Sequence, residues 1–269
     1  MRTTEQSSLY NDIEKMSTLE ILQHMNHEDH KVPEAIAGQL PNIQKLIDGI
    51  VERVPKGGRI FYLGAGTSGR LGIVDASEIP PTFGVHDLFI GIMAGGDKAI
   101  RTAAEGAEDD REQGWKDLQP FNPTENDVVV GIAASGSTPY VLGVIEDAKK
   151  HGLLTGCVVN NYDSPIAAAV DCPIEVVCGP EFLTGSTRLK SGTAQKLVLN
   201  MISSATMVRL GRIRGNKLVD MQLTNVKLVD RGTRMIMSET GIEDYELAKK
   251  MLLQYGKVRA AVDAYKSGK

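Results

Sequence analysis

Two glycine- and hydroxyl-rich segments each follow an apolar run of the kind that forms a buried strand. The first, GAGTSGR at residues 64–70, follows RIFYL, and the second, ASGSTP at residues 134–139, follows DVVVGIA. Such a turn directs backbone N–H groups and hydroxyls at one point beside the N-terminus of the next helix, where a phosphate can bind. The candidate binding residues are Thr67 and Ser68 in the first segment, and Ser135, Gly136, Ser137 and Thr138 in the second.

Two other interpretations of these segments are weaker. Glycines that only tighten turns and hydroxyls that only cap helices would explain one such segment, but two of them after strands of one sheet favour a site. The first segment also fits the dinucleotide-binding pattern GxGxxG. The acidic residue expected about 20 residues later at a strand end is missing, because Asp87 precedes the next strand.

Glu78 is a candidate proton donor. It falls in the last turn of the helix that leaves the first segment, because Pro80 and Pro81 must end that helix. The negative end of a helix dipole disfavours an ionised carboxylate, and a group that stays protonated there suits a general acid.

Three further charged residues are candidates for ligand contacts. Glu105 and Glu108 are spaced i, i+3 in AAEGAEDD, which we interpret as helical despite Gly106. The residues alone leave open whether this pair forms a site or a solvated helix face. Lys190, in the hydroxyl-rich segment that precedes a long helix, could bind an anion or a sugar oxygen.

The elements that position these residues alternate between strands and helices. This order predicts an α/β protein, a three-layer α/β/α sandwich with a mainly parallel sheet, over residues 57–239. Residues 1–56 are predicted as an N-terminal helical segment, in which Ser17 and Glu20 have capping-box spacing. Residues 240–269 are predicted as a small helical appendage of two helices broken at Gly256. The predicted strands are 59–63, 88–93, 127–133, 154–159 and 174–177, and the predicted longer helices are 17–31, 33–55, 139–150 and 190–210.

Composition excludes several classes of function. The 30 basic and 34 acidic residues of the 269-residue chain give a net charge of −4, without a basic block for nucleic acid or an anionic membrane. No apolar run approaches the roughly 20 residues that span a bilayer, and the N-terminus has no apolar signal core. The three scattered cysteines favour reduced thiols in a cytoplasm. The histidines at 24, 27 and 30 drift around a helix, so we expect no metal site.

The chain resembles the N-acetylmuramic acid 6-phosphate etherase family of the sugar isomerase (SIS) superfamily in four long segments that occur in the family's order. The resemblance runs from about residue 17 to about residue 241, and the glucokinase regulatory protein shares the same loops. The segments are GAGTSGRLGIVDASEIPPTFGV (64–85), EGAEDD (105–110), VVVGIAASGSTPYV (128–141) and TGSTRLKSGTAQKLVLNM (184–201).

The resemblance implies a SIS fold and a cytoplasmic, homodimeric enzyme that needs no metal or redox cofactor. Its substrate would be a small phosphosugar, N-acetylmuramic acid 6-phosphate, whose D-lactyl ether is cleaved during cell-wall sugar recycling to N-acetylglucosamine 6-phosphate and D-lactate. By motif, Glu78 matches the family's proton donor and Glu108 its other catalytic glutamate. The remaining matches are residues 135–138 to the phosphate-binding loop, Thr67 and Ser68 to the sugar-binding turn, and Lys190 to a ligand-contacting lysine.

Two other functions remain open at this point. An aldose–ketose phosphosugar isomerase could use the same fold with one glutamate that moves a proton between C1 and C2. A sugar-phosphate-binding regulator would not be an enzyme, but it would be expected to carry a further domain. The resemblance also implies a longer C-terminal region, so we expect the appendage at 240–269 to be shortened.

Overall fold

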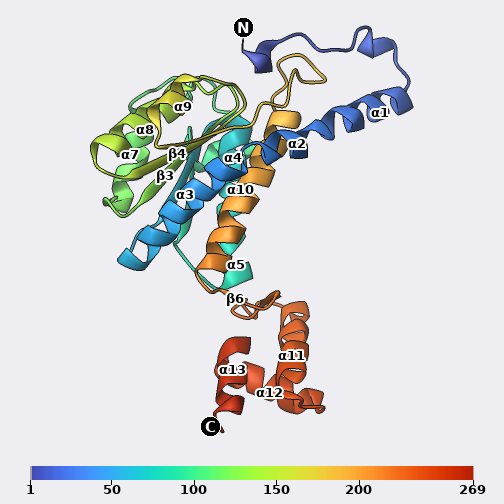
Figure 1. Cartoon of the computed structure of the whole chain (residues 1–269), viewed down its shortest axis with the longest axis vertical. Helices are drawn as coiled ribbons and strands as arrows, with labels where there is room; N and C mark the ends of the chain where they lie inside the picture. The colour runs from blue at the N-terminus through green and yellow to red at the C-terminus, as the bar shows by residue number, and fades with distance from the viewer. Residues whose placement is uncertain (1, 269) are drawn as a thin grey trace. The chain divides into compact units, whose positions relative to one another are not determined.

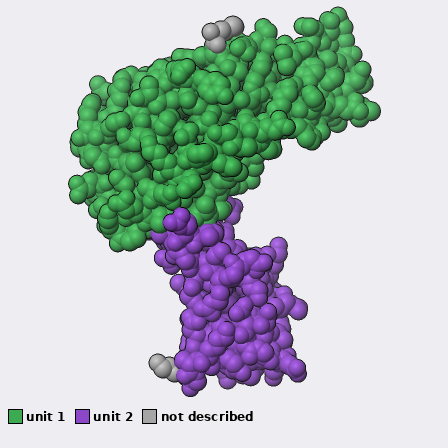
Figure 2. Space-filling view, viewed as in Figure 1, with its two compact units in different colours: residues 1–77, 88–206 green, residues 78–87, 207–269 purple. Residues whose placement is uncertain are grey.

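The computed structural model describes residues 2–268, which form two compact units (Figure 2). Unit 1 comprises Met1–Ser77 and Leu88–Thr206, and unit 2 comprises Glu78–Asp87 and Met207–Lys269. Within the described residues, no helix is both long and apolar enough to cross a membrane.

A five-stranded, wholly parallel sheet forms the centre of unit 1, with the strand order β2-β1-β3-β4-β5. Every residue of β1 and β3 is buried, which explains why these strands are continuous apolar runs in the sequence. The predicted α/β fold with a mainly parallel sheet is therefore confirmed. The strands are β1 (Ile60–Gly64), β2 (Phe89–Met93), β3 (Val128–Ala133), β4 (Leu154–Val159) and β5 (Cys172–Glu175).

Helices cover both faces of this sheet (Figure 1). One layer contains α7 (Gln113–Leu118), α8 (Pro139–Lys150) and α9 (Pro165–Ala169), and the core beneath it joins strand residues such as Phe61 and Val129 to Val144 of α8. The opposite layer contains α3 (Leu40–Arg53), α4 (Gly66–Ser77) and α10 (Lys190–Arg209). The short helix α6 (Gly96–Arg101) follows β2.

The N-terminal segment begins with two 3-10 turns, Thr3–Glu5 and Ile13–Lys15, followed by α1 (Thr18–Asp29) and α2 (Lys31–Ala37). Ser17 and Glu20 form the predicted capping box at the start of α1. The helix predicted over 33–55 is instead divided into α2 and α3, because the chain turns at Gly38.

Unit 2 is a small helical body with its own core. The helices α11 (Val226–Thr240), α12 (Tyr245–Tyr255) and α13 (Val258–Lys266) pack against one another around Ile236, Leu252 and Val262. The short helix α5 (Ile79–Phe83) and the hairpin of β6 (Ile213–Arg214) and β7 (Lys217–Leu218) complete the unit.

The helical body begins before residue 240. Gly256 ends α12 with a φ of +69°, so the predicted break between the last two helices is confirmed. Helix α11 joins these two helices because its apolar side packs on them, and a Cβ on Gly232 would lie only 2.8 Å from Leu252. The division into domains 1–56, 57–239 and 240–269 stays a prediction about independent folding.

Candidate active site

The strand order places two turns side by side at the carboxyl edge of the sheet. Strands β1 and β3 are neighbours, and the chain continues from them to opposite sides, to β2 and to β4. Ligands of open α/β sheets bind at such a switch point, outside the carboxyl ends of the strands. The two hydroxyl-rich segments of the sequence lie there, between β1 and α4 and between β3 and α8.

A buried chain of amides fixes the first turn. The Ser68 hydroxyl, which is 7% exposed, donates to Gln195 Oε1 at 2.8 Å, and Gln195 Nε2 donates to Asn160 Oδ1 at 3.0 Å. Thr67, next to it, is half-buried at the start of α4. The turn after β1 is thus attached to α10 and to the end of β4, which leaves Thr67 as the more accessible hydroxyl.

The second turn has a conformation that requires glycine. Gly136 has a φ of +68°, and a Cβ there would lie 2.4 Å from Ser164. The Ser137 N–H donates to Ser135 Oγ at 3.3 Å, and Thr138 is the N-cap of α8 without a side-chain cap bond. Because the Thr138 hydroxyl does not cap α8, both this hydroxyl and the N–H groups at the N-terminus of α8 are available to bind an anion.

Glu105 and Glu108 lie in a loop, not in a helix. Helix α6 ends at Arg101, residues 102–112 form turns and extended stretches, and Gly106 has a φ of +75°. The helical interpretation of this segment is therefore wrong. The positive φ of Gly106 makes a tight turn, and i, i+3 spacing occurs in such turns as well as in helices. The carbonyl of Glu108 accepts a hydrogen bond from the Tyr140 N–H at 3.0 Å, which ties this loop to the first turn of α8.

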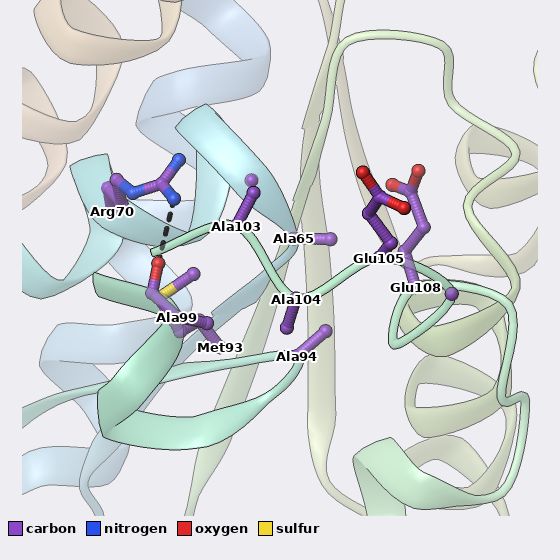
Figure 3. A pocket seen from close by; sticks show the side chains of 11 residues that line it. Ala65, Arg70, Met93, Ala94, Ala99, Ala103, Ala104, Glu105 and Glu108 are labelled. Atoms are coloured by element: carbon purple, nitrogen blue, oxygen red, sulfur yellow. Dashed lines mark hydrogen bonds between the residues drawn. The ribbon is translucent and has the colours of Figure 1, made fainter. Parts of the chain in front are cut away.

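Both glutamates line a cavity of about 210 Å³ in unit 1 (Figure 3). Its wall is formed by the turn after β1, the end of β2, helix α6 and the loop 103–108. Two exposed carboxylates in a cavity that the first hydroxyl-rich turn also lines can bind the hydroxyls of a polyol and exchange protons with it. The lining residues are Ala65, Gly66, Arg70, Met93, Ala94, Ala99, Ala103, Ala104, Glu105, Gly106 and Glu108.

Lys190 is held in a buried ion pair. Its side chain is 1% exposed, and its Nζ donates to the carboxylate of Glu28 and to the carbonyl of Cys178 at 3.0 Å. Burial raises the pKa of Glu28, but hydrogen bonds from Lys190 and Lys31 outweigh it and lower the pKa to about 2. Lys190 is not among the residues that line the cavity, so the ligand contact inferred for it stays a prediction.

Glu78 lies between two helices and belongs to unit 2. Helix α4 ends at Ser77, and Glu78 is the exposed N-cap residue of α5, whose first turn contains Pro80 and Pro81. The expected helix end before the prolines is thus present, but Glu78 lies just beyond the last turn of α4. One turn earlier, buried Asp75 accepts hydrogen bonds from Asn200 at 2.6 Å and from Ser203 on α10, and burial raises its pKa.

Four residues of this region did not stand out in the sequence. Arg70 lines the cavity, and Gln195, Asn160 and Asn161 are buried amides that hold the two turns. Asn160 and Asn161 directly follow β4, so their place after a strand was the available signal. Among residues 2–268, no three His, Cys, Asp or Glu side chains are placed so that they could share a metal ion.

Comparisons with known proteins agree with this architecture. Residues 42–149 match the family model of the glucokinase regulatory protein N-terminal SIS domain. The phosphoheptose isomerase of Francisella tularensis, a solved structure, superimposes with a TM-score of 0.54 at 16% identity, over 71% of this chain and 98% of its own. Such a distant likeness supports the fold alone.

Two curated relatives are much closer in sequence. The N-acetylmuramic acid 6-phosphate etherase of Porphyromonas gingivalis is 56% identical over 98% of this chain and 97% of its own length. The etherase of the same name from Christiangramia forsetii is 58% identical over 98% of this chain and 96% of its own. Identity of this extent over nearly the whole of both chains shows that the protein belongs to the N-acetylmuramic acid 6-phosphate etherase family.

Proposed function

We propose that this protein is a carbon–oxygen lyase that cleaves the D-lactyl ether of N-acetylmuramic acid 6-phosphate. The products are N-acetylglucosamine 6-phosphate and D-lactate, which fits a role in the recycling of cell-wall sugars. The observation that carries the proposal is the cavity that Glu105 and Glu108 line after the carboxyl ends of β1 and β2, whose wall includes Ala65 and Gly66 of the first hydroxyl-rich turn. The name of the relatives described above supports the choice of substrate.

The reaction needs two groups in opposite protonation states. An ether at C3 of a sugar is a poor substrate for displacement because its leaving group is an alkoxide. Opening the ring exposes an aldehyde at C1, which acidifies the hydrogen on C2. Glu108, as the carboxylate, removes that proton, while an acid protonates the departing lactyl oxygen. The C3–O bond breaks and leaves an α,β-unsaturated aldehyde.

Addition of water completes the reaction. Water adds at C3 of the unsaturated aldehyde, C2 regains a proton, and the sum of the two stages is hydrolysis of the ether. We assign Glu78 as the acid toward the leaving oxygen and then as the base toward water. This role rests on the match of SEIPPT, residues 77–82, to the SECPPT string that the resemblance implies for the family, from which it departs only by Ile79 in place of Cys.

The binding residues follow from the two turns. Ser135, Gly136, Ser137 and Thr138, with the N-terminus of α8, would hold the phosphate, because N–H groups and hydroxyls converge there on one anion. Thr67 and Ser68 would contact the sugar, Ser68 as an acceptor because its hydroxyl proton is donated to Gln195. Glu105 would accept a hydrogen bond from a sugar hydroxyl. Lys190 could reach the substrate only if its ammonium exchanged Glu28 for the ligand.

We also propose that the protein is a cytoplasmic homodimer. Leu19 and Leu22 on α1, together with Leu9 before it, are each more than half exposed. A second copy of the chain would remove these apolar side chains from water. Light scattering after gel filtration tests this, and a mass equal to one chain at micromolar concentration would contradict it.

Substitution of the two catalytic glutamates tests the proposed function. Glu108→Gln and Glu78→Gln should release D-lactate roughly 10²–10⁴-fold more slowly than the unmodified protein, because each removes one general acid–base group. Both variants should still bind the phosphosugar. Asp109→Asn, an exposed neighbour of Glu108, is the matched control and should release lactate at the normal rate. Near-normal release by either glutamine variant would remove that residue from the mechanism.

Incubation in D₂O separates the etherase from an isomerase on the same fold. An isomerase would convert N-acetylglucosamine 6-phosphate or fructose 6-phosphate into a new ketose or aldose. We expect no such product, and lactate should be released only from N-acetylmuramic acid 6-phosphate. Formation of a new sugar without lactate release would favour the isomerase.

A further inference from the structure

One wall of the cavity has a composition that the proposed roles of the glutamates do not explain. Five of its lining residues are alanines, which present methyl groups and no hydrogen-bonding side chain. Figure 3 shows Ala65, Ala94, Ala103 and Ala104 between Arg70 on one side and the carboxylates of Glu105 and Glu108 on the other, with Ala99 next to Arg70. The cavity therefore joins a small apolar surface to a cation at one end and to the proposed base at the other.

Arg70 is held in place without a carboxylate partner. Its Nε donates to the carbonyl of Ile100 at 2.9 Å and its Nη2 to the carbonyl of Ala99 at 2.7 Å, so the guanidinium rests on the C-terminus of α6. No ion pair joins Arg70 to any acidic side chain in residues 2–268. Its Nη1 amino group takes part in neither carbonyl bond and remains available for a ligand.

The lactyl group has the complementary chemistry. It carries a carboxylate and a methyl group on the carbon that is bonded to the ether oxygen. A cavity of about 210 Å³ has the volume of about seven water molecules at roughly 30 Å³ each, which is enough for a group of this size. A guanidinium is the side chain best suited to bind a carboxylate in a fixed orientation.

We propose that the cavity is the subsite for the lactyl group, in which Arg70 binds the carboxylate and the alanines contact the methyl group. This inference rests on the proposed function. The ether oxygen then lies toward the glutamate end of the cavity, where the C3–O bond breaks. Arg70 thus determines specificity, because it contacts the part of the substrate that the product N-acetylglucosamine 6-phosphate lacks.

The test compares two ligands that differ only in the lactyl group. Arg70→Gln should raise the KM for N-acetylmuramic acid 6-phosphate about 10- to 100-fold, the usual range for a lost hydrogen bond to a charged group. Its Kd for N-acetylglucosamine 6-phosphate, measured by calorimetry, should stay within about twofold of the normal value. The KM of Arg70→Lys should lie between those of the unmodified protein and Arg70→Gln, because lysine keeps the charge but lacks the planar guanidinium with its two parallel donors. An equal loss for both ligands, or for neither, would overturn the assignment.

A second variant avoids the bonds between Arg70 and α6. Ala103→Leu leaves Arg70 intact and fills the cavity with a larger side chain from an exposed loop position. It should raise the KM for the lactyl-bearing sugar at least about 10-fold and leave binding of N-acetylglucosamine 6-phosphate unchanged. Ala37→Leu, at an exposed position of α2 outside the cavity, is the control and should change neither.

The experiments distinguish failure of the lactyl subsite from failure of the proposed etherase function. If the unmodified protein releases D-lactate but Arg70→Gln and Ala103→Leu keep a normal KM, the lactyl subsite is wrong and the proposed function holds. If the unmodified protein releases no D-lactate from N-acetylmuramic acid 6-phosphate, the proposed function is wrong and the subsite with it.

Discussion

Replacement of Lys190 by methionine should destabilise unit 1 by about 3 kcal/mol near neutral pH. Lys190 is almost fully buried, and its removal leaves the Glu28 carboxylate, which is 1% exposed, without its main counter-charge. At 1.36 kcal/mol for each pH unit, the lowering of the Glu28 pKa from 4.5 to about 2 corresponds to about 3 kcal/mol for its three partners Lys190, Lys31 and Tyr10 together, with Lys190 the largest contributor. Loss of one partner of a buried pair costs about 3–5 kcal/mol in other proteins, which agrees with this value.

The stabilisation by the Lys190–Glu28 pair should depend on pH in one direction. The pKa of Glu28 is lower in the folded than in the unfolded protein, so its contribution is fully present above about pH 4.5 and is lost as the pH falls toward 2. The difference in unfolding free energy between the unmodified protein and Lys190→Met should therefore shrink over that range. Lys31 and Tyr10, which also bond to Glu28, should retain part of the effect.

Urea unfolding followed by tryptophan fluorescence measures this directly. Trp115 is the only tryptophan of the chain and lies on α7 in unit 1, so its emission reports that unit alone. Lys56→Met, which removes an exposed pair with Glu52, is the matched control and should cost less than about 1 kcal/mol. A cost below about 1 kcal/mol for Lys190→Met, or a cost that does not change below pH 4.5, would refute the reasoning.

Two further predictions follow from burial and backbone conformation. Gly136→Ala should lower the unfolding free energy by about 1–3 kcal/mol and weaken phosphosugar binding, because the added Cβ meets Ser164 at 2.4 Å. The control Gly57→Ala, at a position with a similar positive φ but open space around it, should lower the unfolding free energy by less. Equal losses for the two variants would contradict the steric argument. The three free cysteines are buried, and burial raises the pKa of Cys157 to about 12 and of Cys178 to about 11, so the folded protein should react with a thiol reagent only after urea is added. Rapid labelling of the folded protein would show that these thiols are accessible.

The sheet and its two turns could be predicted because their signals are local. A strand that is buried on both faces must be a continuous apolar run, and glycine and hydroxyl residues directly after two such strands indicate turns at the edge of the sheet where ligands bind. The capping box at Ser17 is equally local, since its two partners are three residues apart.

The features that the sequence did not reveal depend on distant partners or on backbone angles. The buried ion pair of Lys190 could not be foreseen, because its partner Glu28 lies 162 residues away in the sequence. Gly106 fitted a helix by spacing, but its positive φ makes a turn. The apolar side of α11 could pack on the sheet or on α12, and only the folded chain shows the second.

Arg70 illustrates the same limit at the candidate site. Its place in the segment GAGTSGR gives no sign that its guanidinium would bond to carbonyls about 30 residues further along the chain and line a cavity. The sequence pointed to Glu105 and Glu108, which line that cavity, but it did not predict the conformation of their loop.

Hydrolysis of N-acetylmuramic acid 6-phosphate in H₂¹⁸O tests the central claim most directly. Mass spectrometry with fragmentation locates the label, and a parallel incubation of N-acetylglucosamine 6-phosphate corrects for exchange of the C1 aldehyde oxygen. Elimination followed by addition of water predicts ¹⁸O on C3 of the sugar and unlabelled D-lactate. Label in the lactate, with none on C3, would mean displacement at the lactyl carbon and would contradict the account.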